Sequence, residues 1–291
     1  MTAPLPPPRC VAVAANPRSA EAVAESHAVV QFLTERGLCC AAQGPLHSAE
    51  LRETVTQRAA DVLIALGGDG TMLRAGHLCA PVGVPILGIN MGRFGFLTEI
   101  HRDQWREQLS RMLDGNYRLE RRMMLRADHL REGQVVNSWD VMNEVMVCRG
   151  ALVRPIQVQA SVDGYPLASY VADGLIASTP TGSTAYALAA GGPIMPPELH
   201  NILIIAVAPH LSLDRAIILS EGASVLITPH CDHQAVVSVD GQYPEPLQEG
   251  DSVRVEAGDK PVTFIRFHDP GYFYRNLTLY MEQNPILGNL R

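Results

Sequence analysis

Residues 62–71, VLIALGGDGT, restrict the fold of this chain more than any other segment. The first five are apolar without alternation, which is typical of a strand buried on both faces of a parallel sheet. The glycines around Asp69 then allow a tight turn and a close approach of a ligand to the main chain. A helix-compatible pattern resumes at Met72, so free N–H groups would point at this turn and favour a phosphate. A carboxylate there suggests chemistry on a hydroxyl or a metal ion, although a plain strand-to-helix turn with a capping Asp69 also explains the segment.

Strand-like and helix-like segments alternate through the first 115 residues. This alternation predicts a parallel, doubly wound α/β sheet, whose ligands bind beyond the carboxyl ends of the strands. Two glycine-rich turns, at residues 67–70 and 90–95, follow apolar strands and therefore fall at that edge. The expected strands are residues 10–15, 38–42, 62–66 and 84–89, and the expected helices are residues 19–36, a short one from Ser48, residues 72–80 and one around residues 105–112.

From about Tyr117 short strand-like runs replace the helices. Asp163-Gly164 and Asp240-Gly241 are hairpin signals between alternating runs, which indicates a sandwich or stacked sheets. The expected strands are residues 118–130, 135–147, 155–162, 165–171, 175–178, 202–207, 224–228, 235–239, 252–256 and 262–267. The expected organisation is an α/β domain over residues 1–115, a mostly β, sandwich-like domain over residues 116–271 with one helix near residues 184–190, and a helix from Tyr274, within residues 272–291, that packs back on the first domain.

The composition argues against several classes of protein. A net charge of -7 at pH 7, without any basic run, argues against a nucleic-acid-binding protein. Lys260 is the only lysine, so the glycine motifs have neither the lysine of a Walker-type phosphate loop nor that of a protein kinase. No G-x-G-x-x-G follows the first strand, which argues against a Rossmann dehydrogenase.

Targeting signals and a metal cluster are also not favoured. The six cysteines lack CxxC spacing and are typical of reduced thiols in a cytoplasmic protein. Residues 4–8 contain too much proline for a signal peptide, and no apolar run is long enough to cross a membrane. Residues 230–233, HCDH, offer metal-binding side chains, but a solvated loop between two strands is the preferred interpretation.

A second unusual segment, residues 173–186, reads DGLIASTPTGSTAY. A short strand leads into hydroxyl residues and then into small helix-forming residues, which makes a good cradle for a phosphate or a ribose. A loop capped by its own Ser and Thr side chains is the alternative. Asn143 and Glu144 interrupt an apolar strand frame, and such polar pairs are costly to bury unless they bind something, either a ligand or each other.

These segments carry a resemblance to a known family. Residues 67–71, GGDGT, resemble the motif shared by NAD kinases, 6-phosphofructokinases and lipid kinases. Residues 88–98, GINMGRFGFLT, together with Asn143-Glu144 and residues 173–186, are similar in order and spacing to bacterial NAD kinase. Weaker similarities are residues 209–212 and 239–242, and the resemblance covers roughly residues 60–275.

The resemblance implies transfer of the γ-phosphoryl group of ATP, or of polyphosphate in some members, to the 2′-hydroxyl of the adenosine ribose of NAD. It implies Asp69 as proton acceptor, a divalent metal ion expected to be Mg²⁺, and a homodimer or homotetramer with the site between the two domains. At the position of Val171 some members have a substrate-binding arginine, which leaves the use of NADH open. The residues expected to line the NAD site are Asp69, Gly70, Arg74, Asn143, Glu144, Arg154, Val171, Asp173, Thr184, Ala185, Tyr186, Ala187, Leu188, Ala189, Ala208 and Gln242. Those expected at the ATP phosphates are Gly67, Gly68, Gly70 and Thr71.

Two other functions remain open from the residues alone. One is a different GGDGT kinase that acts on a sugar phosphate or a lipid, against which residues 173–186 count. The other is a nucleotide-binding regulator without catalysis, against which the intact Asp69 and Asn143-Glu144 count. An acceptor screen would separate the two kinases, and an assay for NADP would separate an enzyme from a regulator.

Overall fold

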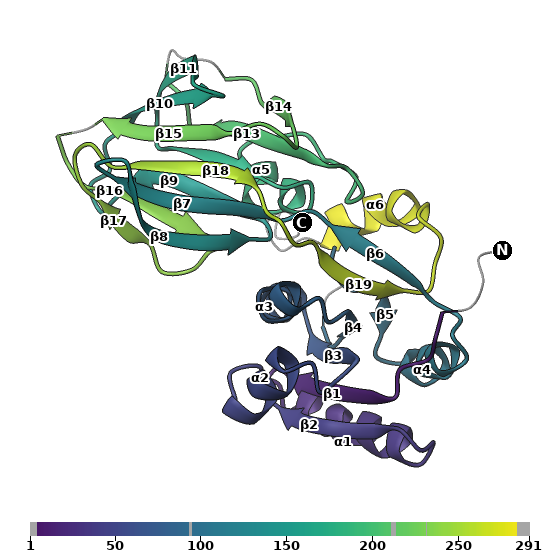
Figure 1. The fold of residues 1–291 in the computed structure, drawn as a ribbon. Helices are drawn as coiled ribbons and strands as arrows, with labels where there is room; N and C mark the ends of the chain where they lie inside the picture. Colours follow the sequence, from purple (N-terminus) through teal and green to yellow (C-terminus); the bar gives the residue numbers. More distant parts are fainter. Residues whose placement is uncertain (1–4, 93–94, 211–213, 231, 284–291) are drawn as a thin grey trace. The chain divides into compact units, whose positions relative to one another are not determined.

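The structure, a computed structural model, describes residues 5–92, 95–210, 214–230 and 232–283 (Figure 1). The chain divides into two compact units: the first is Met1–Arg121 with Val262–Arg291, and the second is Arg122–Pro261. Among the described residues, none of the helices combines the length and the apolar character needed to cross a bilayer.

The first unit is built on a sheet with the strand order β2-β1-β3-β4-β19-β6, in which β5 pairs with β4. Strands β1 to β5 and β19 are paired in parallel where the register is known. The apolar run of β3 is buried at every position, as the sequence predicts for a strand covered on both faces. The strands are β1 (Cys10–Ala15), β2 (Cys39–Gly44), β3 (Val62–Gly67), β4 (Ile86–Asn90), β5 (Ile100–His101), β6 (Arg118–Arg122) and β19 (Val262–Arg266).

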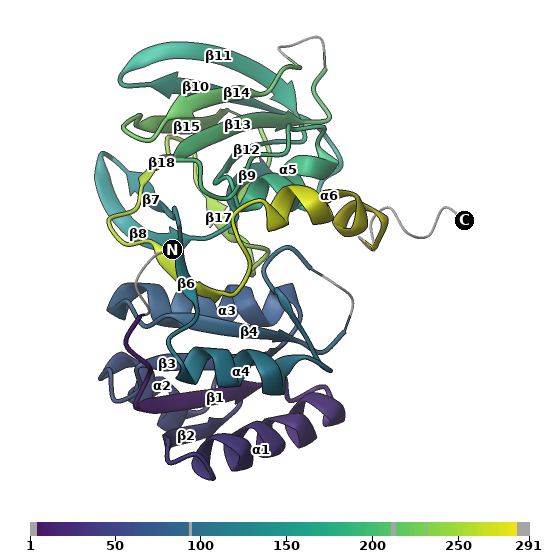
Figure 2. The ribbon, with the colours of Figure 1, turned by 90° about the vertical axis from the view of Figure 1, so that its right-hand side faces the viewer.

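Helices cover both faces of this sheet (Figure 2). On one face Phe32 and Trp105 bring α1 and α4 together, with their rings edge to face and the centroids 5.3 Å apart. The other face is covered by α2 and α3. Ser19 caps α1 by accepting the N–H of Ala22, and Gly37 follows the helix with φ 83°, in agreement with the helix expected over residues 19–36. The helices are α1 (Ala20–Thr34), α2 (Ala49–Thr56), α3 (Asp69–Cys79), α4 (Trp105–Leu113) and α6 (Tyr272–Gln283), with a 3₁₀ turn η1 (Ala80–Val82).

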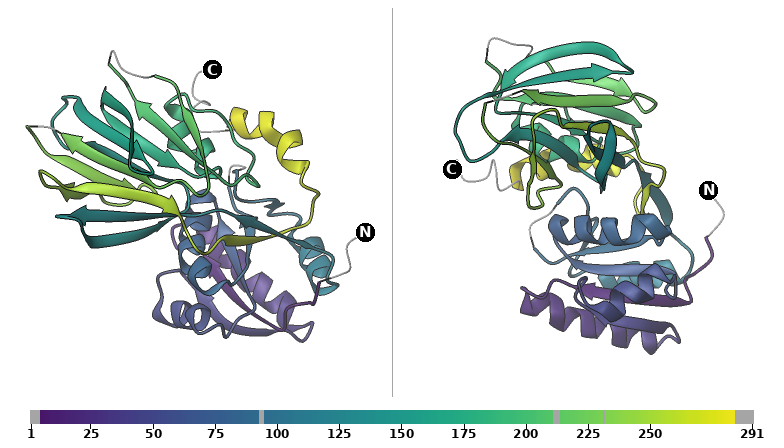
Figure 3. Two further views of the ribbon diagram at one scale, coloured as in Figure 1. Left: turned by 45° about the horizontal axis from the view of Figure 1, so that its top comes forward. Right: turned by 60° about the vertical axis from the view of Figure 1, so that its left-hand side comes forward.

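The second unit is a sandwich of two antiparallel sheets (Figure 3). Inward residues of both sheets, such as Val147, Leu175 and Val255, form one apolar core. At Asp163-Gly164 both residues have positive φ, 52° and 82°, which confirms the predicted hairpin turn. One sheet, in spatial order, contains β11 (Tyr165–Ala172), β10 (Ile156–Val162), β15 (Val225–His230), β18 (Ser252–Ala257), β7 (Leu125–Arg131) and β8 (Gln134–Val141). The other contains β14 (Ile217–Ser220), β13 (Asn201–Val207), β12 (Gly174–Ser178), β9 (Glu144–Arg149), β16 (Ala235–Val239) and β17 (Glu245–Leu247).

Two long predicted strands are each broken in the structure. Residues 118–130 form β6 and β7, which belong to different units. Residues 135–147 form β8 and β9, which belong to opposite sheets of the sandwich, so the chain crosses between sheets at Met142 and Asn143. Val141 of β8 and Val145 of β9 face the same core, so the apolar pattern alone does not reveal such a crossing.

The predicted boundaries of the domains need correction. Strands β6 and β19 lie in the sheet of the first unit, where Phe264 of β19 pairs with Ile86 of β4. Both strands had been expected in the β-rich domain, because strand pairing between distant segments leaves no local signal. The last helix begins at Tyr272 rather than Tyr274, and residues 284–291 of the predicted C-terminal segment lie outside the described part of the chain.

Candidate functional site

The two glycine-rich turns of the first unit lie next to each other. Gly67, the last residue of β3, is paired with Asn90, the last residue of the parallel strand β4. The carboxyl ends of both strands therefore meet at one edge of the sheet, as the sequence predicts. Residues Arg93 and Phe94 of the second turn lie outside the described residues.

Asp69 joins these two turns. It is the first residue of α3, after Gly68 at the N-cap, so the helix begins three residues earlier than predicted. Its carboxylate accepts the N–H of Phe96 at 2.9 Å and the N–H of Leu97 at 3.1 Å. A side chain at Gly95 would collide with that carboxylate, so the close approach requires glycine there. The side chain of Asp69 therefore has a role beyond that of a helix cap, which was the simpler alternative.

The other predicted residues of this turn divide between surface and core. Gly70 and Arg74 are exposed on α3, where a phosphate can reach them. Thr71 is buried and packs against Gly67, where a Cβ atom would collide with the Thr71 side chain. The structure thus gives the Thr71 side chain a packing role.

The second unit contains a cavity of about 760 Å³. This volume lies within the range of roughly 300–1,000 Å³ that is usual for small-molecule sites. It lies on the outward face of the sheet, because residues of β9 and β16 alternate between the sandwich core and the cavity. Three of the predicted NAD-site residues meet there: Glu144, Asp173 and Tyr186. The remaining lining residues are Met146, Cys148, Arg149, Gly150, Ala151, Gln234, Val236, Ser238, Asp240, Gly241, Pro244 and Pro246.

Asp240 organises the crossing between β8 and β9. Its carboxylate accepts the main-chain N–H groups of Met142, Asn143 and Glu144 at 2.8, 2.7 and 3.0 Å. The sequence had suggested that Asn143 and Glu144 bond either to a ligand or to each other. The structure shows that their N–H groups are held by a third residue, which aims Glu144 into the cavity.

Glu144 is a buried carboxyl group with spare hydrogen-bonding capacity. Its side chain accepts the N–H of Tyr186, and its Oε2 atom has no hydrogen-bond partner among the described residues. Burial, together with the nearby charge of Asp240, raises the pKa of Glu144 from 4.5 to about 8. Glu144 is therefore mostly neutral at pH 7, and it can both donate and accept a hydrogen bond in the cavity.

Asp173 is held by an arginine that the sequence analysis did not select. Arg149 Nε donates to Asp173 Oδ1 at 2.9 Å, and the same guanidinium donates to the carbonyl oxygen of Leu152. Both Arg149 and Asp173 line the cavity. The ion pair fixes one oxygen of Asp173 and leaves the cavity with a charged, oriented carboxylate.

The hydroxyl-rich segment serves mainly its own loop. Ser178 and Thr179 donate to the carbonyl oxygens of Asn143 and Met142, and Ser183 donates to that of Pro180. All three hydroxyl residues are fully buried. The predicted helix is only a 3₁₀ turn η2 (Gly182–Thr184) followed by α5 (Tyr186–Ala189), which is too short for a helix-terminal phosphate site. The capped-loop alternative is therefore correct for these side chains.

Several other predicted residues lie outside this cavity. Ala187, a residue of α5, is buried, and its side chain packs in a core cluster with Ile176 and Leu203. Gln242 lines a second hollow of about 660 Å³, which shares Gly241 and Pro244 with the first. The others are Asn143, Thr184, Ala185, Leu188 and Ala189, which flank the hydroxyl loop, together with the exposed residues Arg154, Val171 and Ala208.

The structure describes Ala208 in full, but residues 209–212 and 230–233 only in part. Ala208 has a φ of 48°, and a strained non-glycine residue of this kind often marks a functional loop. Of the HCDH segment, Cys231 lies outside the described residues, and His233 Nδ1 lies 3.0 Å from the exposed Asp232. No group of three His, Cys, Asp or Glu side chains suited to a metal ion is found in the described part of the chain. Within the 209–212 similarity, Leu211 and Ser212 also lie outside it.

Comparisons with known proteins agree with this architecture. Sequence profiles of the ATP-NAD kinase N-terminal and C-terminal domains match residues 11–117 and 142–267. The chain is 43% identical to the NAD kinase of Heliobacterium modesticaldum over 237 residues, which are 81% of this chain and 83% of that protein. The chain belongs to the NAD kinase family. This family consists of phosphotransferases whose reaction converts NAD to NADP.

Further relatives extend the match over nearly the whole chain. The NAD kinase of Chloroflexus aurantiacus is 36% identical over 275 residues, which cover 94% of this chain and 99% of that protein. Among solved structures, an NAD kinase from Archaeoglobus fulgidus in complex with ATP matches with a TM-score of 0.73 and 25% identity, over 93% of this chain and 97% of that chain. Yeast NADH kinase complexed with NADH shares the fold, with a TM-score of 0.80 and 23% identity over 96% of this chain and 89% of that chain.

Several important residues were missed by the sequence analysis. Asp240 was identified only as a turn residue within a weak similarity, and Met146, Cys148, Val236 and Ser238 were regarded as ordinary strand residues. The signal available for the last four was the alternation along β9 and β16, whose outward positions face the cavity. For Asp240, no local signal predicts three main-chain donors from residues that lie almost a hundred positions earlier.

Proposed function

We propose that this NAD kinase family member transfers the γ-phosphoryl group of ATP to the 2′-hydroxyl of the adenosine ribose of NAD, with Asp69 as the proton acceptor. The observation that carries the proposal is the cavity of the second unit. There Glu144, Asp173 and Tyr186, which the sequence had already selected for NAD, line one hollow of suitable size. We assign NAD to this cavity and the ATP phosphates to the glycine turn at Gly67, Gly68 and Gly70.

The chemistry of the transfer fits the residues. A ribose hydroxyl is a poor nucleophile near neutral pH, so a carboxylate within hydrogen-bond reach assists by accepting its proton. The oxygen then bonds to the γ-phosphorus, the bond to the bridging oxygen breaks, and ADP leaves with that electron pair. Asp69 suits the role because it follows the glycine turn at the carboxyl end of β3, and the N–H groups of Phe96 and Leu97 orient its carboxylate.

Mg²⁺ is part of this proposal. In nucleotide sites Mg²⁺ is usually held by substrate phosphates together with one or two carboxylates, so a cage of protein ligands is not needed. The described residues contain no group of three side chains suited to a metal ion, which agrees with a Mg²⁺ ion held mainly by the substrate phosphates. When bound, Mg²⁺ neutralises charge on the phosphates, a task for which this chain has only one lysine.

Within the NAD site we retain Gly70, Arg74, Asn143, Tyr186 and Gln242 as predicted contacts. Arg154, Val171, Ala208 and the segment Thr184, Ala185, Leu188 and Ala189 also remain predictions. We further propose a homodimer or homotetramer that works in the cytoplasm. The free thiols of the five cysteines in the described residues support a reducing compartment. Light scattering coupled to gel filtration would measure the oligomeric state.

The decisive experiment combines Asp69→Asn with a direct assay. The purified protein is incubated with NAD, Mg²⁺ and either ATP or polyphosphate, and NADP is quantified. We expect wild-type protein to form NADP. We expect Asp69→Asn to bind NAD nearly as well by calorimetry while its kcat falls roughly 10²- to 10⁴-fold, which is typical for loss of a general base. A kcat within about threefold of wild type would remove Asp69 from this role.

A further inference from the structure

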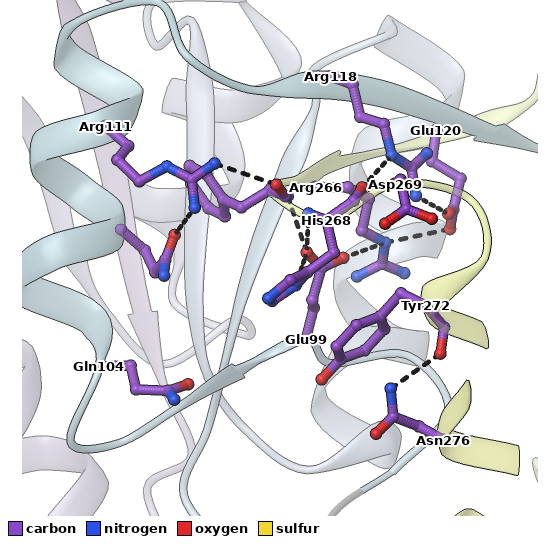
Figure 4. Close-up of polar contacts among 12 residues, drawn as sticks. Glu99, Gln104, Arg111, Arg118, Glu120, Arg266, His268, Asp269, Tyr272 and Asn276 are labelled. Atoms are coloured by element: carbon purple, nitrogen blue, oxygen red, sulfur yellow. Dashed lines mark hydrogen bonds and ion pairs between the residues drawn. The ribbon is translucent and has the colours of Figure 1, made fainter. Parts of the chain in front are cut away.

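Arg266, at the end of β19, is a buried charge beside the turn that holds Asp69. Its side chain is 4% exposed, and the two carboxylates next to it, of Glu99 and Glu120, are 5% and 6% exposed (Figure 4). Arg266 Nε donates to Glu120 Oε1 at 3.1 Å and lies 3.6 Å from Glu99 Oε2. A buried ionic cluster of this kind need not stabilise the fold, because proteins with apolar side chains of similar volume in its place are often equally stable.

The same guanidinium reaches the loop that contacts Asp69. Arg266 Nη1 donates to the carbonyl oxygen of Leu97 at 3.0 Å. Leu97 also donates its own N–H to the Asp69 carboxylate. The carbonyl and N–H groups of Leu97 are separated only by its own backbone dihedral angles, so a hold on the carbonyl limits where the N–H can point.

A second contact ties the far end of this loop to β19. Glu99 Oε1 accepts the main-chain N–H groups of Phe267 and His268, both at 2.7 Å, and lies 2.6 Å from His268 Nδ1. Residues 97 and 99 are therefore both anchored on the strand end that carries Arg266. Gly95, directly before the two donors, adds few conformational restraints of its own, so the anchors at residues 97 and 99 help to order the donors of Asp69.

We propose that Arg266 is a positioning residue for the proton acceptor of the phosphoryl transfer. It holds the Leu97 carbonyl so that the N–H groups of Phe96 and Leu97 aim the Asp69 carboxylate at the hydroxyl. This inference rests on the proposed function, in which Asp69 accepts the proton. In this role Arg266 acts on Asp69 through the main chain of Leu97. Its planar guanidinium serves Leu97 and Glu120 at the same time, which the single ammonium group of lysine does less well.

The test compares two variants of Arg266 with a matched control in the full-length protein. Arg266→Gln removes the charge. Arg266→Lys keeps the charge and is the second test of the inference in case Arg266→Gln fails to fold. Arg111→Gln is the control, because Arg111 donates at 3.1 Å to the carbonyl of Phe267, the neighbour of Arg266, without contacting Leu97. Steady-state kcat and KM for NAD and for ATP are measured for each variant, alone and combined with Asp69→Asn.

We expect Arg266→Gln to lower kcat about ten- to a hundredfold with KM values within about threefold of wild type, since small misplacements of a catalytic group have effects of this size. Arg266→Lys should recover part of the loss, and Arg111→Gln should keep a kcat within about twofold of wild type. Combined with Asp69→Asn, the Arg266 variants should lower kcat by less than about twofold further, because residues that act as a unit are not additive.

Three results distinguish a failure of this inference from a failure of the proposed function. If Asp69→Asn is slow but the Arg266 variants have normal kcat, the positioning role is wrong and the proposed function stands. If the effects of Arg266 and Asp69 multiply, Arg266 acts independently of Asp69 and the inference is also wrong. If Asp69→Asn itself turns over normally, the base assignment fails and the inference fails with it.

Discussion

Glu144→Gln offers a direct test of the cavity electrostatics. In the folded protein burial and the charge of Asp240 raise the pKa of Glu144 from 4.5 to about 8. The folded state thus holds this proton more tightly than the unfolded state, so the free energy of unfolding falls as the pH rises through that window. Gln cannot titrate, and the variant should therefore become more stable relative to wild type as the pH increases.

The size of the effect follows from the pKa difference. At about 1.4 kcal/mol per pH unit, the stability of Glu144→Gln relative to wild type should increase by about 4 kcal/mol between pH 5 and pH 9. Water that enters the cavity raises the effective dielectric constant and reduces this value, to no less than about 2 kcal/mol. Glu144 is only 8% exposed, which is why most of the effect should survive.

The assay is urea unfolding of both proteins at five pH values from 5 to 9. Contributions from groups that do not interact with Glu144 cancel in the difference between variant and wild type. Glu249→Gln, which changes an exposed carboxyl of the same unit, is the control and should shift stability by no more than about 0.5 kcal/mol at any pH. A difference between Glu144→Gln and wild type that stays constant from pH 5 to pH 9 would refute the reasoning.

The neutral state of Glu144 has a second consequence for binding. A protonated carboxyl group and an amide both offer a donor and an acceptor, so Glu144→Gln should bind NAD at pH 7 within about threefold of wild type. Glu144→Ala lacks both groups and should bind roughly tenfold more weakly. If calorimetry at pH 7 shows that Glu144→Gln weakens NAD binding as much as Glu144→Ala does, Glu144 contacts NAD as an anion.

Three further predictions concern the groups that hold the two carboxylates and the sheet crossing. Gly95→Ala places a methyl group against the Asp69 carboxylate, so kcat for NADP formation should fall more than about tenfold while the circular dichroism spectrum is unchanged. Asp240→Asn loses the charge that accepts three main-chain N–H groups, and urea unfolding should show a destabilisation of about 2–4 kcal/mol. Arg149→Gln frees Asp173 to move, so KM for NAD should increase about tenfold while Tm falls by only about 2 °C; a large drop in Tm with unchanged KM would make the pair purely structural.

Features with local causes could be predicted from the sequence. The unbroken apolar run of β3, the turn of glycines after it, the Ser19 cap and the Asp163-Gly164 hairpin are each decided by residues within a few positions of one another. The position of Asp69 at the carboxyl end of a parallel strand follows from the same local pattern. The polar interruption at Glu144 and the hydroxyl-rich segment from Asp173 to Tyr186 were also visible in the sequence, and the structure brings Glu144, Asp173 and Tyr186 to one cavity.

Features that depend on distant pairing were decided only by the tertiary structure. A strand pattern shows that residues 262–266 form a strand, but not that this strand pairs with the distant β4 in the sheet of the first unit. The donors to Asp69 lie 27 and 28 residues further along the chain, and Arg266, which holds one of them, comes from that same distant strand. The sequence therefore determined which carboxylate stands at the glycine turn, whereas hydrogen bonds between distant segments determined how it is held, because such bonds leave no periodicity or spacing along the chain.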